Sequence, residues 1–210
     1  MKRTLKAALG IVLSRLLRIT RSAREATQRV YAYSLLAADI NRPVPASVVV
    51  LGAVDVHGVG NISIGEDVLL YPGLYLETQE QASITIGDGV VISRGVHVVA
   101  MAGVTIGAGS MVGEYTSIRD ANHNRSDEAT IRNAGHTAKP IVIGREVWIG
   151  RGVTVLGGVE IGDGATVGAN AVVTHNVAAG AVVAGVPAEP IVSRKGLSST
   201  RPKASNYTAP

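Results

Sequence analysis

The stretch from Ile143 to Val173, IGREVWIGRGVTVLGGVEIGDGATVGANAVV, repeats every six residues and decides the fold of the chain. An aliphatic residue stands at positions 143, 149, 155, 161, 167 and 173, and Gly follows it in four of the five complete repeats. Neither a helix, with a period of about 3.6 residues, nor a strand, with a period of about two, explains a strict six. A fixed period of six predicts a parallel β-helix. A Val/Gly-rich sandwich is disfavoured, because its turn signals recur at about 8–12 residues and drift.

The period has a physical basis in a triangular coil, in which each repeat supplies one short strand and one tight turn. The aliphatic residue points inward and stacks on its equivalent in the next coil, so stability is a sum over neighbouring coils. Gly after it suits a turn that needs positive φ or a close approach of two backbones. Less regular repeats precede this stretch, with inward positions at Val50, Val56, Ile62, Ile64, Leu70, Leu76, Ile86, Ile92, Val98, Ile106, Val112 and Ile118. The register of the six-residue repeat shifts around Ile62/Ile64, Glu77–Gln81 and Ala102–Gly103. These shifts predict looser coils or small loops at the corners.

The composition agrees with such a column. The 210 residues are 46% hydrophobic and include 25 Gly but no Phe, which a column of Val, Ile and Leu tolerates better than a conventional core. The absence of Cys excludes disulfides, a thiolate nucleophile and Cys-ligated zinc, and it fits a reducing compartment. We expect a cytoplasmic protein, with peripheral contact at the inner face of the membrane as an open addition.

Residues 1–42 form a basic amphipathic segment that we expect to be helical, and Pro43 and Pro45 end it. Residues 1–40 hold eight Lys/Arg against Glu25 and Asp39, a net charge of +6. The remaining residues hold twelve basic and fourteen acidic groups, a net charge of −2. The body of the chain has no basic stripe with interleaved aromatic residues, which argues against nucleic-acid binding.

Four interpretations of this segment follow from its pattern. A secretory signal is disfavoured, because Arg15 and Arg18 interrupt the apolar run and no small-residue cleavage site follows. A transmembrane span is disfavoured, because no uncharged stretch of about 20 residues exists. Two interpretations stay open: a helix that packs on the solenoid or on a sister subunit, and a basic helix that lies on an anionic membrane surface.

We expect the β-helix to span residues 46–192, with one inserted, protruding loop at 119–139. The six-residue repeats stop after Ile118 and resume at Ile141/Ile143. The residues between them are polar and charged, and they include two of the five His. Long irregular loops in compact repeats are either functional or disordered, and insertions on solenoids often form the binding face. The polar tail at 193–210 is expected to be disordered.

Several motifs narrow the family. Ser117-Ile-Arg-Asp120-Ala-Asn-His123 opens the loop, and Pro140-Ile-Val-Ile-Gly144-Arg-Glu-Val-Trp148-Ile-Gly150 follows it. Val167-Gly-Ala-Asn-Ala-Val-Val-Thr174 and Ala184-Gly-Val-Pro187-Ala come later. This order resembles the hexapeptide-repeat acyltransferases of the maltose/galactoside O-acetyltransferase type and their polysaccharide-modifying relatives, over roughly residues 62–192.

The resemblance implies a left-handed β-helix, a homotrimer, and active sites between subunits, with acetyl-CoA as co-substrate and no metal. It implies that His123 is catalytic and that CoA lies along Trp148, Gly150, Arg151, Gly168, Ala169, Thr174, His175 and the turn at Pro187. Three positions depart from the family pattern: Arg151 stands where Ser is common, His175 where Lys is common, and Glu189 where Arg is common. We therefore expect the contacts to the CoA phosphates to be partly rearranged, onto Arg151, Arg194 or Lys195.

Acyl transfer from a thioester requires the acceptor to lose a proton as it attacks, and neutral imidazole suits this task at about pH 7. His123 is the expected general base, with Asp120 and Asn122 as further catalytic residues, and Asp120 or Glu114 is expected to orient the imidazole. The candidate acceptor contacts are Glu114, Asn124 and His136. Backbone N–H groups of the Gly-rich turns are the expected oxyanion donors. Without Cys or a Gly-x-Ser-x-Gly elbow, direct attack in a ternary complex is favoured over a covalent acyl-enzyme.

The sequence therefore predicts a trimeric, CoA-dependent acyltransferase, acetyl by default, that acts on a hydroxyl of a sugar or glycan-like acceptor. N-acylation of an amino sugar is the alternative within this class. A γ-type carbonic anhydrase-like zinc enzyme using His97 and His123 is an alternative of another class, although the pair of His five residues apart expected of that family is absent. A non-catalytic trimeric scaffold is the third alternative.

Overall fold

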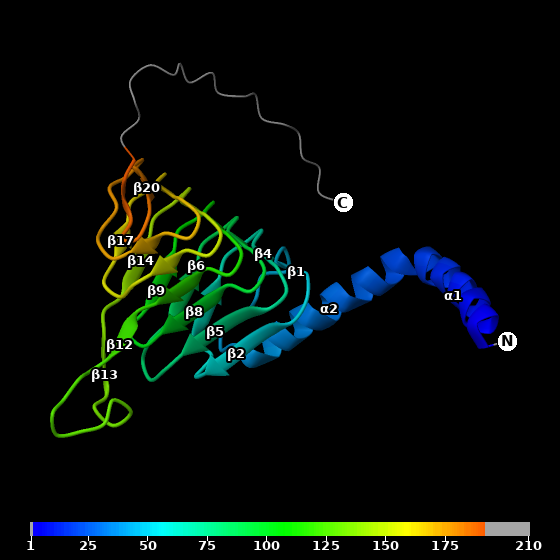
Figure 1. Cartoon of the computed structure of the whole chain (residues 1–210), viewed down its shortest axis with the longest axis horizontal. Coiled ribbons are helices and arrows are strands. Elements are labelled where there is room, and N and C mark those ends of the chain that lie inside the picture. Colours follow the sequence, from blue (N-terminus) through cyan, green and yellow to red (C-terminus); the bar gives the residue numbers. More distant parts are fainter. Residues whose placement is uncertain (1, 192–210) are drawn as a thin grey trace, which may run out of the picture.

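A computed structural model describes residues 2–191 and shows a three-sided prism of parallel strands preceded by two helices (Figure 1). The tail at 193–210, with the phosphate-binding candidates Arg194 and Lys195, lies outside the described residues. Successive coils each add one short strand to each side of the prism. The β-helix predicted from the period of six is therefore confirmed.

Three sheets form the sides of the prism. Sheet A contains, in order, β1 (Val49–Val50), β4 (Leu69–Leu70), β7 (Val91–Ile92), β10 (Met111–Val112), β15 (Trp148–Ile149), β18 (Thr166–Val167), β20 (Val182–Ala184) and β21 (Glu189–Pro190). Sheet B contains β2 (Val54–Gly58), β5 (Leu74–Thr78), β8 (His97–Ala100), β11 (Ser117–Arg119), β16 (Thr154–Val155) and β19 (Val172–Val173). Sheet C contains β3 (Ile62–Ile64), β6 (Ile84–Ile86), β9 (Val104–Ile106), β14 (Ile141–Ile143) and β17 (Glu160–Ile161).

The core is one apolar column inside the prism. Strand pairing stacks the inward residues of successive coils in register, and on sheet A these residues are Leu70, Ile92, Val112, Ile149 and Val167. Each of them is at most 1% exposed. Because every coil contributes equivalent aliphatic groups, the column needs no large aromatic residue to fill it.

The irregular spacing of the earlier repeats has one structural cause, which is extra chain at the corner between sheets B and C. Ile62 and Ile64 both lie on β3 and both point inward, so they do not start separate strands as the sequence pattern suggested. The chain between the β5 and β6 strands and between the β8 and β9 strands also bulges at this corner. The longest insertion, between β11 and β14, leaves the prism at the same corner.

That insertion, predicted as an irregular loop at 119–139, has an ordered root. β12 (Ala121–His123) pairs antiparallel with β13 (His136–Ala138), and the resulting hairpin protrudes from the prism (Figure 1). The polar composition of the segment hid this pairing, because its strands are short and bury few apolar side chains. The hairpin fixes the position of the residues near its root.

Two helices, α1 (Lys2–Ile19) and α2 (Arg21–Asp39), precede the prism and meet at a bend at Thr20, where ψ is 3°. The C-terminal half of α2 covers the first coil and buries Ala32 and Leu36, and Ile40, which directly follows the helix, is buried with them. The Tyr33 hydroxyl donates a hydrogen bond to the Val44 carbonyl oxygen at 2.7 Å. Since an uncovered solenoid end exposes its core, α2 stabilises the first coil. α1 extends beyond the prism (Figure 1).

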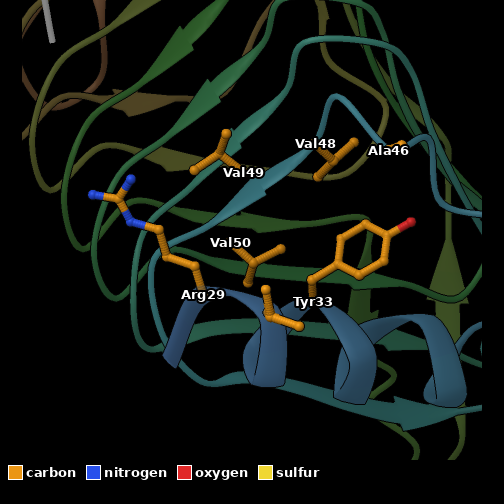
Figure 2. A pocket seen from close by; sticks show the side chains of 7 residues that line it. Arg29, Tyr33, Ala46, Val48, Val49 and Val50 are labelled. Atoms are coloured by element: carbon orange, nitrogen blue, oxygen red, sulfur yellow. The ribbon is translucent and has the colours of Figure 1, made fainter. Parts of the chain in front are cut away.

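An apolar groove of about 400 Å³ remains between α2 and β1 (Figure 2). Val30 and Tyr33 line it from the helix and Val49 and Val50 from the strand, with Arg29 at one end. Among residues 2–191, neither helix combines the length and the apolar character that crossing a bilayer requires.

Candidate active site

A groove of about 450 Å³ lies on sheet A and extends to its corner with sheet B. The strands β10, β15 and β18 form its floor, and the residues that follow them form its edge. Six predicted site residues line this groove, namely Glu114, Trp148, Gly150, Arg151, Gly168 and Ala169. The structure therefore brings together most of the positions that the sequence assigned to CoA.

Glycine is required at the groove's edge because successive coils approach one another closely there. A Cβ atom on Gly150 would lie 2.7 Å from the Ala169 backbone nitrogen, and one on Gly168 would lie 2.7 Å from the Ala184 Cβ. The Gly150 N–H donates to the Val167 carbonyl oxygen at 2.8 Å, so it is already satisfied within the fold. The N–H groups of Gly113 and Gly168 are satisfied in the same way. These three glycine N–H groups are therefore not the oxyanion donors that the sequence suggested.

Two side chains project over this floor. Trp148 is 59% exposed although it lies on a strand, because β15 directs its indole outward between Met111 and Thr166 of the neighbouring strands. The Arg151 guanidinium carbon lies 5.4 Å from the centroid of the Tyr115 ring, a cation–π geometry that holds the cation at the groove. An exposed indole beside a restrained cation offers both an aromatic surface and an anion partner.

The second region of the candidate site is the root of the hairpin. His123 lies directly opposite His136 in the β12–β13 register. The flanking bonds from the Asn124 N–H to the Gly135 carbonyl oxygen and from the Lys139 N–H to the Asp120 carbonyl oxygen make this a non-hydrogen-bonded pair. Opposed side chains approach most closely in such pairs. The two exposed imidazoles therefore share one face of the hairpin.

A smaller cavity of about 250 Å³ lies at this root. Its lining combines the predicted residues Asp120, Asn122, His123 and Asn124 with Thr137, Lys139 and Gly157. The Thr137 hydroxyl donates a hydrogen bond to the Asn124 amide oxygen at 2.7 Å. The sequence did not identify Thr137, Lys139 or Gly157, because only the hairpin pairing places them beside His123.

Asp120 has a structural task that the sequence did not predict. Its carboxylate is buried and accepts hydrogen bonds from the backbone N–H groups of Met101 at 2.8 Å, Ala102 at 2.7 Å and Gly103 at 2.7 Å. The expectation that Asp120 orients the His123 imidazole is therefore corrected, because both carboxylate oxygens are occupied by the preceding coil. Asp120 anchors the hairpin root and is a positioning residue.

Glu114, the other candidate to orient His123, lies in the groove on sheet A rather than at the hairpin. The strand β11 separates the two corners, and three residues of strand span about 10 Å. Glu114 therefore cannot contact the His123 of its own chain in this structure. The groove begins at the coil that carries the hairpin, because β10 and β11 belong to one coil, and it extends over the next two coils.

The remaining predicted CoA positions lie outside the groove. Thr174 and His175 follow β19 on the side of sheet C, and the Thr174 hydroxyl lies 2.8 Å from His175 Nδ1. The Leu156 N–H donates to the Val173 carbonyl oxygen, so the coil that carries Thr174 and His175 stacks on the coil of Leu156. Thr174 and His175 therefore lie at the corner between sheets B and C, where the hairpin leaves the prism, and not at the corner between sheets A and B, where the groove lies. The turn at Pro187, which follows a cis peptide bond, lies against Val172 at the end of the prism.

The sequence also missed a row of stacked rings on the outer face of sheet B. The Tyr75 ring stacks on His97 at 4.3 Å and on His57 at 4.8 Å between centroids. The hydrogen bonds from the Gln79 amide and the Tyr75 hydroxyl hold the pKa of Glu77 below its ordinary value. The hydrogen bond to the Glu77 carboxylate raises the pKa of the Tyr75 hydroxyl. Among residues 2–191 of one chain, no three His, Asp or Glu side chains are grouped so that they could hold a metal ion.

The comparisons with known proteins find the same repeat and the same fold elsewhere. A family model for the bacterial transferase hexapeptide, six repeats long, matches residues 140–175. A hexapeptide-repeat-containing acetyltransferase from Vibrio cholerae is 25% identical, with a TM-score of 0.53 over 93% of this chain and 100% of that one. No curated protein sequence matches the chain.

Two further solved structures share the fold. AntD, an N-acyltransferase from Bacillus cereus in complex with dTDP and 3-hydroxybutyryl-CoA, is 20% identical, with a TM-score of 0.66 over 78% of this chain and 88% of that one. PerB from Caulobacter crescentus, in complex with CoA and GDP-perosamine, is 21% identical, with a TM-score of 0.50 over 70% of this chain and 58% of that one. These comparisons confirm the β-helix fold and the six-residue repeat over residues 140–175.

Proposed function

Since this chain is a hexapeptide-repeat protein with the left-handed β-helix of that class, we propose that it is a CoA-dependent acyltransferase. The proposed acceptor is a hydroxyl of a sugar or glycan-like molecule, and the default donor is acetyl-CoA. One observation carries this proposal: a groove with an exposed Trp148 and a hairpin with His123 occupy different corners of the prism, and the groove begins at the coil that carries the hairpin.

Two copies of the chain would complete such a site. A rotation about an axis parallel to the prism preserves height, so it can bring the hairpin of one copy to the groove of the next without sliding the coils. A homotrimer, the assembly that the family resemblance implies, has such a rotation and would hold three equivalent sites. In this arrangement, Glu114 of the neighbouring copy is available to orient His123, a role it cannot perform within its own chain.

The groove suits an acyl-CoA in its chemistry. Its floor is apolar and presents the glycine edge and the exposed indole, which suits a pantetheine chain, and Arg151 supplies a cation for phosphate. Thr174 and His175 stack on the hairpin's corner, so they would approach CoA from the second copy. The positions assigned to CoA thus divide between the two corners that the proposed assembly brings together.

The proposed reaction is direct. His123 accepts the proton of the acceptor hydroxyl as the hydroxyl oxygen attacks the thioester carbonyl carbon. The carbon–sulfur bond then breaks, and the protonated His123 returns the proton to the CoA thiolate, which leaves as the thiol. The acceptor gains an acyl ester, so atoms and charge balance. Asn122, on the same strand as His123, has an exposed amide at the cavity and is the candidate donor for the developing oxyanion.

A donor and acceptor screen tests this function. Purified protein is incubated with acetyl-CoA or longer acyl-CoA thioesters and with neutral sugars, amino sugars or sugar nucleotides, and CoA thiol release is measured. Ester formation on a hydroxyl, identified by alkaline lability of the product, is the expected result. Acylation only of amino sugars would select the N-acyl alternative, which the amino-sugar ligand of PerB suggests as an acceptor class to include. Binding of acyl-CoA without any turnover would select the scaffold.

A further inference from the structure

The helical arm formed by α1 and α2 presents an apolar stripe that the protein itself does not cover. Leu5, Leu9, Val12, Leu16 and Ile19 recur at alternating spacings of four and three, which places them on one side of a helix. All five are exposed, from 55% for Leu16 to 82% for Ile19. A contiguous exposed apolar surface of this kind usually marks a contact with another molecule or with a membrane.

The arm continues from α1 through the bend at Thr20 into α2. The Thr20 N–H donates to the Leu16 carbonyl oxygen and the Arg24 N–H donates to the Thr20 carbonyl oxygen, so two backbone hydrogen bonds span the bend. On α2, Val30 is 67% exposed and lines the apolar groove of Figure 2. Arg29 lies at the end of that groove, so an apolar surface and a cation meet where the arm joins the prism.

Basic residues surround this stripe. Residues 1–40 carry a net charge of +6, whereas the rest of the chain carries −2. Glu25, one of the two acidic residues in the arm, already pairs with Arg21 at 2.7 Å. Arg15 and Arg18 lie outside the apolar side, and an 18-residue helix is about 27 Å long. The arm is therefore long enough to lie on a surface and charged to favour an anionic one.

The positive charge of the arm distinguishes between two partners that could cover the stripe, a second copy of the arm and an anionic lipid surface. A second copy of the arm would bring two positive segments together, and like charges oppose that contact at moderate salt. An anionic lipid surface attracts basic residues while its acyl region accepts the apolar stripe. Charge complementarity therefore favours lipid over self-association through this face.

We propose that the α1–α2 arm is a peripheral membrane-binding element that lies in the interface of an anionic bilayer. The stripe from Leu5 to Ile19 enters the acyl region, and the surrounding arginines and lysines contact headgroup phosphates. The active site would then face acceptors near the membrane, a consequence that rests on the proposed function. The lipid contact itself does not depend on it.

Vesicle co-sedimentation of the full chain tests this inference. The probes are vesicles of phosphatidylglycerol and phosphatidylcholine in equal amounts, and vesicles of phosphatidylcholine alone. Wild-type protein is expected to bind the anionic vesicles at least about 10-fold more tightly, and added salt is expected to weaken that binding. The variant Leu9→Gln/Leu16→Gln is expected to lose at least about 10-fold in affinity, because both polar side chains would enter the acyl region.

The control is Ala7→Gln/Ser14→Gln, which introduces the same side chains on the opposite side of α1 and is expected to stay within about 2-fold of wild type. Binding that ignores lipid charge, absent binding to both vesicles, or equal loss in both variants would overturn the inference. Sedimentation velocity without lipid measures the number of associated copies, and so tests whether a second copy of the arm covers the stripe instead of lipid. If Leu9→Gln/Leu16→Gln lowers the number of associated copies and leaves vesicle binding unchanged, the stripe is a contact between copies. Because vesicle binding is measured without substrate, its failure leaves the proposed catalysis intact.

Discussion

The Asp120 carboxylate accepts a hydrogen bond from the Gly103 backbone N–H at 2.7 Å, which joins the root of the hairpin to the corner of the preceding coil. The same carboxylate accepts the Met101 and Ala102 N–H groups. A buried carboxylate with three backbone donors is a rigid anchor, because each donor would otherwise be unsatisfied. The position of His123, three residues later, depends on this anchor.

Asp120→Asn tests the anchor. An amide presents at most one oxygen to three N–H donors, so we expect a loss of about 2 kcal/mol in the free energy of unfolding and at least about a 10-fold loss of turnover. Chemical denaturation and CoA release measure the two effects. The control is Asp163→Asn, since Asp163 is exposed and Arg145 N–H is one donor to it at 2.7 Å; its effect should stay below about 1 kcal/mol. Unchanged stability in Asp120→Asn would contradict the anchoring role.

His123→Ala tests the general base. Loss of proton transfer should lower kcat by about 10²- to 10⁴-fold while the secondary structure and the thermal midpoint stay unchanged, because His123 is exposed. His136→Ala is the matched control, since it removes an imidazole from the same face of the hairpin. We expect it to change KM for the acceptor more than kcat. Equal loss of kcat in both variants would show that neither imidazole acts alone as the base.

Trp148 offers a direct probe of donor binding, because it is the one Trp in the sequence. Addition of acyl-CoA should change its fluorescence in a saturable manner, since the indole is exposed in the groove of the free protein. Trp148→Ala should raise KM for acyl-CoA by about 10-fold with little change in the unfolding midpoint. A fluorescence signal that does not respond to CoA would place the donor elsewhere.

Glu77 predicts an acid-dependent part of the stability. Its pKa is lowered in the folded state by the Gln79 amide first, and also by the Tyr75 hydroxyl and Arg119. A lowered carboxyl pKa contributes stability at pH values above the unfolded pKa, and this contribution is lost as pH falls through the folded pKa. Glu77→Gln should therefore flatten the acid limb of the stability curve as the pH falls below the ordinary Glu pKa of about 4.3. An unchanged limb, measured by denaturation at each pH, would contradict this contribution.

The sequence predicted the column well because its period records a physical requirement that every coil repeats. Ile143, Ile149 and Val155 lie on successive strands, as the period of six residues requires, and all three are buried. The groove was predictable for a related reason: Gly150 and Gly168 mark places where backbones approach too closely for a Cβ. The buried positions and the glycines both recur within the six-residue unit, so the sequence shows them directly.

The task of Asp120 was not predictable in the same way. Its donors lie 17–19 residues earlier in the chain, and only the stacking of two corners brings them to its carboxylate. The hairpin pairing of His123 with His136 likewise depends on a ribbon that buries little apolar surface and so leaves no periodic signal. The β2–β5–β8 ring stack is equally hidden, because His57, Tyr75 and His97 are far apart in the sequence.

Mixed assembly of two inactive variants tests most directly whether one copy's hairpin serves another copy's groove. Chains carrying His123→Ala are co-expressed in equal amounts with chains carrying Trp148→Ala/Arg151→Ala, and CoA release is measured below the KM for acyl-CoA. If the site lies between copies, random assortment leaves about one site in four with an intact hairpin and an intact groove, so about a quarter of wild-type activity should return. Activity no greater than the sum of the two separately assembled variants would contradict a site shared between copies.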